Sequence, residues 1–220
     1  STLFPYTTLF RSSGKYLALN LHSPQDVVKD LGADTMRLYL LFKAPVEQVL
    51  DWDTNAIQGQ TRWVKRLWQL LEHYKSYHYY LHYRSTEMLT HSTSVDSSAE
   101  HSLHRLIHTT IRDVTHDMFV SHSFNTAIAK LMTLSNELTQ VTRGSKQVEL
   151  LKHYERIPLL ESPVYELGMR ALFLMLAPMA PHLASEAWTL LNRSIHPEEL
   201  PPTRPLTIFE QGRPKFDPDI

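Results

Sequence analysis

The chain of 220 residues has no cysteine and only six glycines, and each shortage excludes certain kinds of functional or structural site. Without cysteine there are no disulfides and no cysteine-ligated zinc or iron–sulfur sites. The glycines match neither the dinucleotide-binding pattern nor the P-loop pattern, so the sequence predicts no phosphate-binding loop. No apolar run reaches the ~20 residues needed to span a bilayer, and we therefore expect no membrane insertion.

An excess of charge of one sign is also lacking. The 22 Lys and Arg residues nearly balance the 23 Asp and Glu residues, which gives a formal net charge of −1. Nucleic-acid-binding domains often show a clear basic excess, so this balance argues weakly against RNA binding unless a local basic patch is present. The hydrophobic content of 42% supports a sizeable core in one domain of ordinary size.

Helical periodicity is the main pattern that the sequence does contain. No segment shows the alternation of a strand, a hairpin turn or βαβ spacing. The fold class is therefore predicted to be all-α, an antiparallel helical bundle in which short connections place successive helices side by side. Apolar residues at helical spacing predict helices over about 24–31, 35–43, 54–83, 99–119, 124–141, 163–176 and 181–192, with a weaker one at 149–156.

Capping residues define the first two helices. Ser23 and Pro24 are suited to begin the first helix, and Gly32 is suited to end it. Asp34 is predicted to cap the helix that starts at Thr35. Asp34 and Arg37 lie one turn apart, and we expect them to form an ion pair worth about 0.2–0.5 kcal/mol.

Two segments outside the helices also have predicted roles. Asp51 and Asp53 flank Trp52, and we interpret them as caps for the helix from Thr54, with Trp52 packed on the bundle, rather than as an acid–base pair. The proline-rich tail after Pro197 has no periodicity. It is predicted to be extended, or ordered only against parts that this chain lacks.

The run from Arg62 to Trp68 is the candidate RNA-binding feature. On a helix, Arg62, Lys65 and Arg66 share one face, and Trp63 is predicted to lie near it, where its indole could stack on a base. The opposite face is predicted to be apolar: Val64, Leu67, Trp68 and Leu71. Such a basic face could neutralise RNA phosphates. The alternative is an ordinary solvated helix face.

Three of the thirteen histidines, His101, His104 and His108, recur at helical spacing on one predicted helix. A metal site requires convergent ligands with supporting partners, and no HExxH pattern is present. We predict no metal site and no catalytic residue. The histidine face is predicted to be solvated, with RNA contact as the alternative.

Two separated segments carry a family resemblance: Gly32–Pro45, closed by Leu50–Asp53, and Leu176–Trp188. Both resemble leucyl-tRNA synthetases of the bacterial and mitochondrial type, in the order that this family uses. The resemblance covers about residues 20–188. The isoleucine and valine synthetases share the helical domain but usually carry another residue in place of His182, and the same domain of one of them is the nearest alternative.

The resemblance implies a fragment of a leucine–tRNA ligase, which attaches leucine to tRNA-Leu with ATP. It implies these divisions: 13–53, the end of the catalytic signature loop and a stem-contact segment; 54–194, an anticodon-binding-type bundle; and 195–220, the tail. Residues 1–12 are set apart on other grounds, because residues 2–12 resemble a translated sequencing adapter, with a natural irregular N-terminus as the alternative. Residues 13–17 stand where the family has its lysine-bearing ATP loop and do not match it. ATP is therefore expected to bind only the full-length parent.

The part present is expected to dock the body of tRNA-Leu, as a monomer, without catalysing a reaction alone. The drifted positions and the loop rich in His, Ser and Thr favour the mitochondrial matrix, with the cytoplasm as the alternative. A different class of function also stays open, namely a non-enzymatic helical module that binds a protein through an exposed apolar run around Leu172–Leu176.

Overall fold

The computed structural model describes residues 24–43, 52–84, 96–143, 157–195 and 207–219. Within them the chain is helical and contains no strand, which confirms the predicted all-α class. The predicted helix at 149–156 and most of the predicted loop at 85–98 lie outside the described residues. The helices are α1 (Pro24–Leu31), α2 (Ala33–Lys43), α3 (Thr54–Arg84), α4 (Ser97–Phe119), α5 (Phe124–Arg143), α6 (Pro163–Leu176) and α7 (Pro181–Ile195), with short 3₁₀ turns η2 (Pro158–Glu161) and η3 (Ile208–Glu210).

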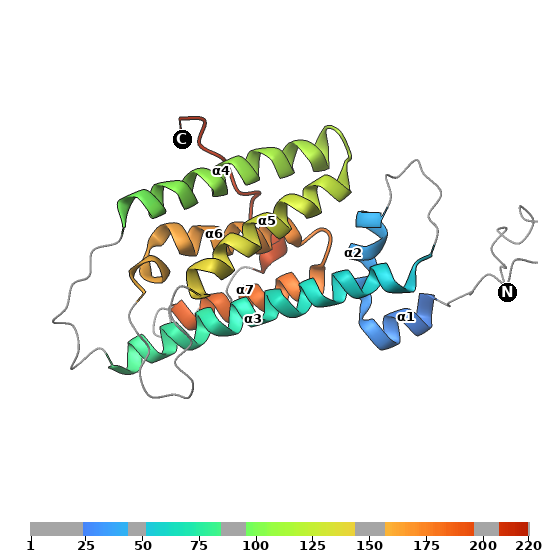
Figure 1. Cartoon of the computed structure of the whole chain (residues 1–220), viewed down its shortest axis with the longest axis horizontal. Coiled ribbons are helices and arrows are strands. Elements are labelled where there is room, and N and C mark those ends of the chain that lie inside the picture. Colours follow the sequence, from blue (N-terminus) through green and yellow to red (C-terminus); the bar gives the residue numbers. More distant parts are fainter. Residues whose placement is uncertain (1–23, 44–51, 85–95, 144–156, 196–206, 220) are drawn as a thin grey trace, which may run out of the picture.

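The helices form one elongated bundle with a small appendage at one end (Figure 1). Helices α4, α5 and α6 pack against one another, and α3 runs along the opposite side, against α5 and α7. Helix α2 contacts α3, α5 and α7, and α1 contacts α2. No helix in the described residues is both long enough and apolar enough to cross a membrane.

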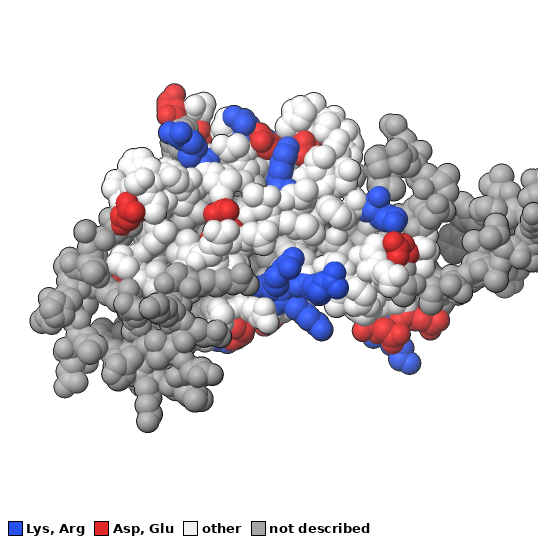
Figure 2. Space-filling model, viewed as in Figure 1, with Lys and Arg blue, Asp and Glu red and all other residues white. Residues whose placement is uncertain are grey.

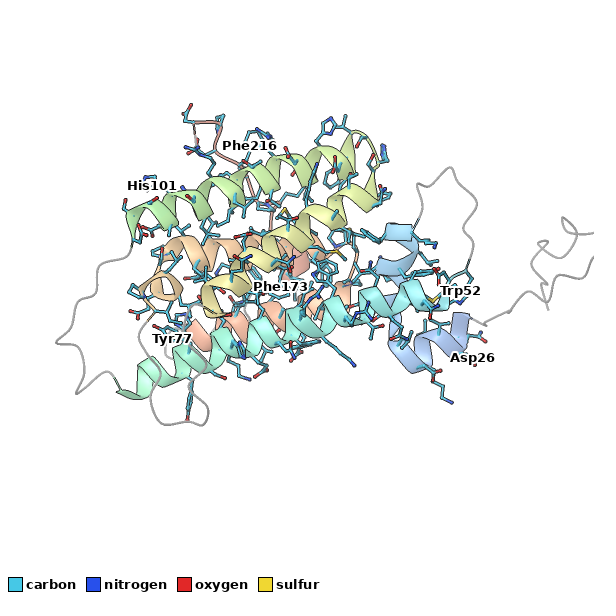
Figure 3. The ribbon with its side chains drawn as sticks, viewed as in Figure 1. Asp26, Trp52, Tyr77, His101, Phe173 and Phe216 are labelled. Carbon is cyan, nitrogen blue, oxygen red and sulfur yellow. The ribbon has the colours of Figure 1, made fainter. Side chains whose placement is uncertain are left out.

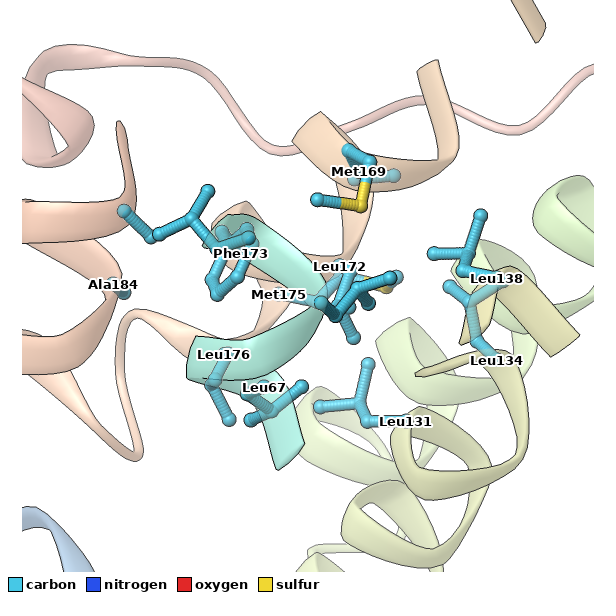
Figure 4. Close-up of a cluster of buried hydrophobic side chains, with 14 of the residues drawn as sticks. Leu67, Leu131, Leu134, Leu138, Met169, Leu172, Phe173, Met175, Leu176 and Ala184 are labelled. Atoms are coloured by element: carbon cyan, nitrogen blue, oxygen red, sulfur yellow. The ribbon is translucent and has the colours of Figure 1, made fainter. Parts of the chain in front are cut away.

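The main core is lined by leucines and aromatic residues from α3 to α7 (Figure 4). Leu172, Phe173 and Leu176 of α6 are fully buried in it. The prediction that the apolar run of α6 is exposed for a protein partner is therefore wrong. Because α6 contacts α4, α5 and α7, this strongly apolar helix is surrounded by protein.

A second, smaller core joins the appendage to α3. Val27 of α1, Tyr39 of α2 and Ile57 of α3 are its buried members, and Trp52 packs against them. The Tyr39 and Trp52 rings meet edge to face with centroids 5.0 Å apart, and Figure 3 shows Trp52 beside the start of α3. The backbone N–H of Asp53 donates to the Tyr39 hydroxyl at 2.8 Å. The prediction that Trp52 packs on the bundle is confirmed.

Local caps set several helix boundaries as predicted. Gly32 has a φ of +86°, the left-handed conformation that ends α1 and lets α2 start at once. Asp53 accepts from the N–H groups of Asn55 and Ala56 at 2.9 and 3.2 Å, so it caps α3. These two backbone hydrogen bonds are the main reason that the pKa of Asp53 lies below its ordinary value. Ser162 caps α6 by accepting from the N–H of Val164 at 3.1 Å.

The tail differs from its prediction over residues 207–219. Ile208 is buried in the main core, and η3 contacts α7. Further along, the Arg213 guanidinium lies 4.4 Å from the centre of the Phe119 ring at the end of α4. Figure 3 shows Phe216 beside α4. This part of the tail is therefore ordered against the bundle itself. One buried apolar residue and one cation–π contact hold it there, although its sequence has no helical period.

Candidate nucleic-acid interface

Three basic side chains form a patch on α3. Arg62, Lys65 and Arg66, called the α3 basic patch below, are all exposed. Figure 2 shows a group of Lys and Arg side chains over the middle of α3. Among the described residues, the Lys and Arg side chains that form ion pairs with carboxylates are others: Lys43, Lys75, Arg112, Lys130 and Arg170. The patch therefore presents its positive charge to solvent.

Trp63 does not belong to this surface. Its side chain is fully buried, and its indole Nε1 donates to Ser135 Oγ of α5 at 3.0 Å. The prediction that Trp63 lies near the basic face and stacks on a base is wrong. Instead, Trp63 anchors α3 to α5 and keeps the basic residues on either side of it turned outward.

The reason for this error is the width of the buried face of α3. Three helices, α2, α5 and α7, contact α3, so its core-facing stripe is broader than a single amphipathic face. The burial of Trp63 could have been predicted from a stripe of residues three or four positions apart. Its members are all buried: Ile57, Gln60, Trp63, Leu67, Leu70, Tyr74 and Tyr77. Val64 and Trp68, which the predicted stripe included, are only partly buried.

A second polar arrangement joins α2 to the turn between α6 and α7. Asp34 is 8% exposed, and it neither caps α2 nor pairs with Arg37 as predicted. Its Oδ2 accepts from the backbone N–H of Leu183 at 2.7 Å, and its Oδ1 lies 2.9 Å from His182 Nδ1. Ala180, the residue before α7, has no side-chain oxygen to cap this helix. Asp34 supplies the missing acceptor from another helix.

Arg37 completes the same junction. Its Nε donates to the carbonyl oxygen of Met179 at 3.0 Å, and its Nη2 donates to that of Pro178 at 2.8 Å. These carbonyls belong to the turn between α6 and α7, outside both helices. Asp34 and Arg37 thus bind this turn and the start of α7 at once, and we call this arrangement the α2 clamp.

The histidines of α4 differ from a uniformly solvated face. His101 is exposed, whereas His104 and His108 are half-buried and their rings meet edge to face at 4.7 Å. The backbone N–H of Asp217 in the tail donates to His108 Nδ1 at 2.8 Å. Burial, with a smaller effect of His104, lowers the pKa of His108 below its ordinary value, against the opposing charge of Asp217. One side of this face is therefore covered by the tail.

The α4–α5 connection is held by a buried carboxylate. Asp117 accepts from Thr126 Oγ1 and from Lys130 Nζ, each at 2.7 Å. Burial by itself would raise the pKa of Asp117, but the hydrogen bonds from Lys130 and Thr126 outweigh it and hold the pKa below its ordinary value. No group of three potential metal ligands is found among the described side chains.

Comparison with known proteins agrees with this architecture. Residues 100–215 match the family described as the anticodon-binding domain of tRNA ligase. The chain is 35% identical over 213 residues to the leucine–tRNA ligase of Nostoc punctiforme, an alignment that covers 97% of this chain and 20% of that protein. It is 36% identical over 192 residues to that of Synechococcus elongatus, covering 86% and 19%. The chain thus spans about a fifth of the length of these relatives.

A solved structure shares the fold. It is the ternary complex of an Agrobacterium radiobacter K84 LeuRS with tRNA and LeuAMS, and it superimposes with a TM-score of 0.64 at 24% identity. The match covers 94% of this chain and 22% of that protein. At this identity the likeness shows the arrangement of the helices alone.

Proposed function

Because the chain belongs to the family of anticodon-binding domains of tRNA ligases, we propose that it docks the body of tRNA-Leu as part of a leucine–tRNA ligase. The observation that carries this proposal is the α3 basic patch. Arg62, Lys65 and Arg66 lie within about one helical turn, exposed and facing solvent, on a helix that three others hold in place. Such a surface suits the phosphates of a folded RNA.

The leucine assignment rests on the relatives rather than on any pocket in this chain. The proteins that match most of its length are leucine–tRNA ligases, of which it spans about a fifth. Leucylation of tRNA with ATP would belong to the longer parent, and this part is not catalytic alone. Residues 13–17, where the resemblance places the ATP loop, lie outside the described residues, so no ATP contact is assigned.

The location in the cell stays a prediction. The relatives named above come from cyanobacteria and carry no support for the mitochondrial matrix. The competing function, a protein-binding module, loses the surface on which it depended, because Leu172, Phe173 and Leu176 are buried.

Salt dependence provides the quantitative test of docking. Each phosphate contact adds roughly 0.9 to the slope of log affinity against log salt, so three contacts predict a loss of about 40-fold between 50 and 200 mM salt. Fluorescence anisotropy with a labelled tRNA-Leu transcript would measure this loss. The double variant Arg62→Glu with Arg66→Glu is expected to weaken binding strongly and to reduce the slope by about two.

A charge-matched control is available on the other side of the bundle. Arg105 of α4 and Lys215 of the tail are exposed, and α4 lies across the bundle from α3 (Figure 1). The variant Arg105→Glu with Lys215→Glu has the same net charge change and is expected to bind tRNA nearly as the original chain does. Equal losses in the two double variants, or no tRNA binding at 50 mM salt, would overturn the docking proposal.

A further inference from the structure

His182 combines a fixed orientation with an exposed ring. Its side chain is 78% exposed, so it contributes little to packing, yet its Nδ1 lies 2.9 Å from Asp34 Oδ1. Asp34 is itself held by the N–H of Leu183. The ring is thus anchored at one nitrogen and presents the other to solvent. A side chain whose role is packing in the core would be buried, whereas this ring is held at Nδ1 and exposed at Nε2.

The anchor determines the chemistry of the free nitrogen. A carboxylate oxygen accepts hydrogen bonds, so the proton between the two residues lies on Nδ1. In the neutral imidazole, Nε2 then keeps a lone pair and acts as an acceptor. The ligand that this nitrogen fits is a hydroxyl or an N–H donor rather than another acceptor.

The surrounding charge favours a hydroxyl over a phosphate. Glu186 lies four residues after His182 on α7, on the same face of the helix, and is exposed. Its negative charge disfavours a phosphate at this place. The nearest cation of the junction, Arg37, already donates to the carbonyls of Pro178 and Met179. The site therefore differs in kind from the α3 basic patch.

The α2 clamp also places His182 on the same rigid unit as that patch. Helix α3, which carries the patch, contacts both α2 and α7, the two helices that form the His182 site. The His182 site therefore adjoins the helix on which we propose that the RNA docks. The 2′-hydroxyl is the donor that an RNA backbone presents along its whole length and that DNA lacks.

We propose that Nε2 of His182, oriented by Asp34, accepts a hydrogen bond from a ribose 2′-hydroxyl of the docked RNA. The residue would then contribute to the preference of this domain for RNA over DNA. This inference rests on the proposed tRNA docking, and it adds a second contact of a different chemistry to it.

The test compares two ligands and two variants. The ligands are a tRNA-Leu transcript and the same sequence made with 2′-deoxyribose throughout. In His182→Asn the amide can still donate to Asp34 from the place of Nδ1, but no atom remains at the place of Nε2. In His182→Gln the amide reaches the place of Nε2 instead. One hydrogen bond corresponds to about a 2- to 10-fold change in affinity.

His182→Asn is expected to lower affinity for the transcript by that factor and to leave affinity for the deoxy ligand unchanged. His182→Gln is expected to restore part of the loss. A transcript affinity unchanged by His182→Asn, or equal losses on both ligands, would overturn the inference while leaving docking intact if Arg62→Glu with Arg66→Glu still weakens binding. If the original chain binds no RNA, both proposals fail.

A measurement on the unsubstituted chain covers the case in which the variants are unstable. With ¹⁵N-labelled histidine, the Nε2 resonance of His182 is expected to shift on addition of the transcript and to stay in place with the deoxy ligand. An Nε2 resonance that is insensitive to both ligands, while α3 amides shift with the transcript, would contradict the inference.

Discussion

The carboxylate of Asp34 on α2 accepts a hydrogen bond from the backbone N–H of Leu183 on α7, a residue 149 positions later, at 2.7 Å. Asp34 also lies in the first turn of α2. The positive ends of two helices therefore meet at one nearly buried negative charge. A contact of this kind replaces the local cap that Ala180 does not provide, and it ties the appendage to the bundle.

Removal of this carboxylate should be costly. In Asp34→Ala the Leu183 N–H and the His182 ring lose their acceptor, and we expect a loss of about 1.5–3 kcal/mol in the free energy of unfolding. Urea denaturation followed by circular dichroism would measure it. Asp30→Ala, at an exposed position of α1, is the control and should change stability by less than about 0.5 kcal/mol. Equal effects of the two substitutions would contradict the capping role of Asp34.

Trp63 should matter for stability and little for RNA binding. Trp63→Phe removes the hydrogen bond to Ser135 and is expected to destabilise the chain by about 1 kcal/mol or slightly more. Because Ser135 is the partner, the double variant with Ser135→Ala should cost less than the sum of the two single variants. Salt-dependent tRNA binding should persist in Trp63→Phe. A loss of binding without a loss of stability would restore the stacking role.

Two glycines inside helices should respond to alanine in opposite directions. A Cβ at Gly168 of α6 would lie 3.0 Å from Ile107 Cδ1 and 3.0 Å from Leu138 Cδ2, whereas a Cβ at Gly59 of α3 would meet no atom within 4 Å. Gly59→Ala is expected to gain up to about 1 kcal/mol from helix propensity. Gly168→Ala is expected to lose about 1–2 kcal/mol net, because overpacking in a close-packed core outweighs that gain.

Thermal denaturation of both glycine variants would check the contrast. Ile107→Val removes the Cδ1 atom and should relieve part of the loss in Gly168→Ala, although the single change itself creates a small void. If Gly168→Ala is as stabilising as Gly59→Ala, the close approach of α4, α5 and α6 at Gly168 is not a constraint.

The contact of the tail with α4 should weaken at acidic pH. His108 accepts from the Asp217 N–H, so Nδ1 must be unprotonated for this bond to form. Since the folded pKa of His108 is lowered, the unfolded chain binds the proton first as pH falls. The contribution to stability is therefore complete above the ordinary value near 6.5 and is lost as pH falls through the lower folded pKa.

Amide hydrogen exchange at Asp217 between pH 7.5 and 5 would measure the contact, after correction for intrinsic exchange. His108→Asn is the matched variant, because its amide oxygen can accept the same bond and does not titrate. Its Asp217 amide should show weaker pH dependence than in the unsubstituted chain. His78, whose pKa burial also lowers, is unchanged in both chains and so does not affect the comparison.

The helices themselves could be predicted because they depend on local patterns. The apolar stripe of α4, the Ser162 cap of α6 and the stop at Gly32 all act within a few residues of where they stand. Their boundaries in the structure lie close to those predicted. Periodicity reports that a helix has a buried face, and short caps report where it ends.

The polar pairs could not be predicted in the same way. Asp34 and Arg37 are suitably spaced for a local ion pair. In the structure Asp34 instead binds the start of α7, and Arg37 binds the turn between α6 and α7. Similarly, Asp117 finds Lys130 across a tight helical connection. The local partner of a charged residue can be predicted from its spacing in the sequence. A distant partner cannot, because only the packing of the helices brings it within reach.

The tail exposes a second limit. Residues 207–219 have no period, yet Ile208 is buried and Arg213 lies over Phe119. Irregular segments are ordered by single contacts of this kind, and no periodic pattern in the sequence predicts such contacts. For the candidate site, Arg62, Lys65 and Arg66 were placed on the surface as predicted, whereas the orientation of Trp63 required knowledge of three neighbouring helices.

The distance along the chain between Asp34 and Leu183 has a consequence for synthesis on the ribosome. At about 5–20 residues per second, the 149 residues that separate them take roughly 7–30 s to make. During that interval α2 has emerged without the amide that its carboxylate binds, while the α4–α5 hairpin can already form from neighbouring residues. The appendage can therefore pack first on α3 and α5, which are made earlier, and its contact with α7 through Asp34 is the last to form.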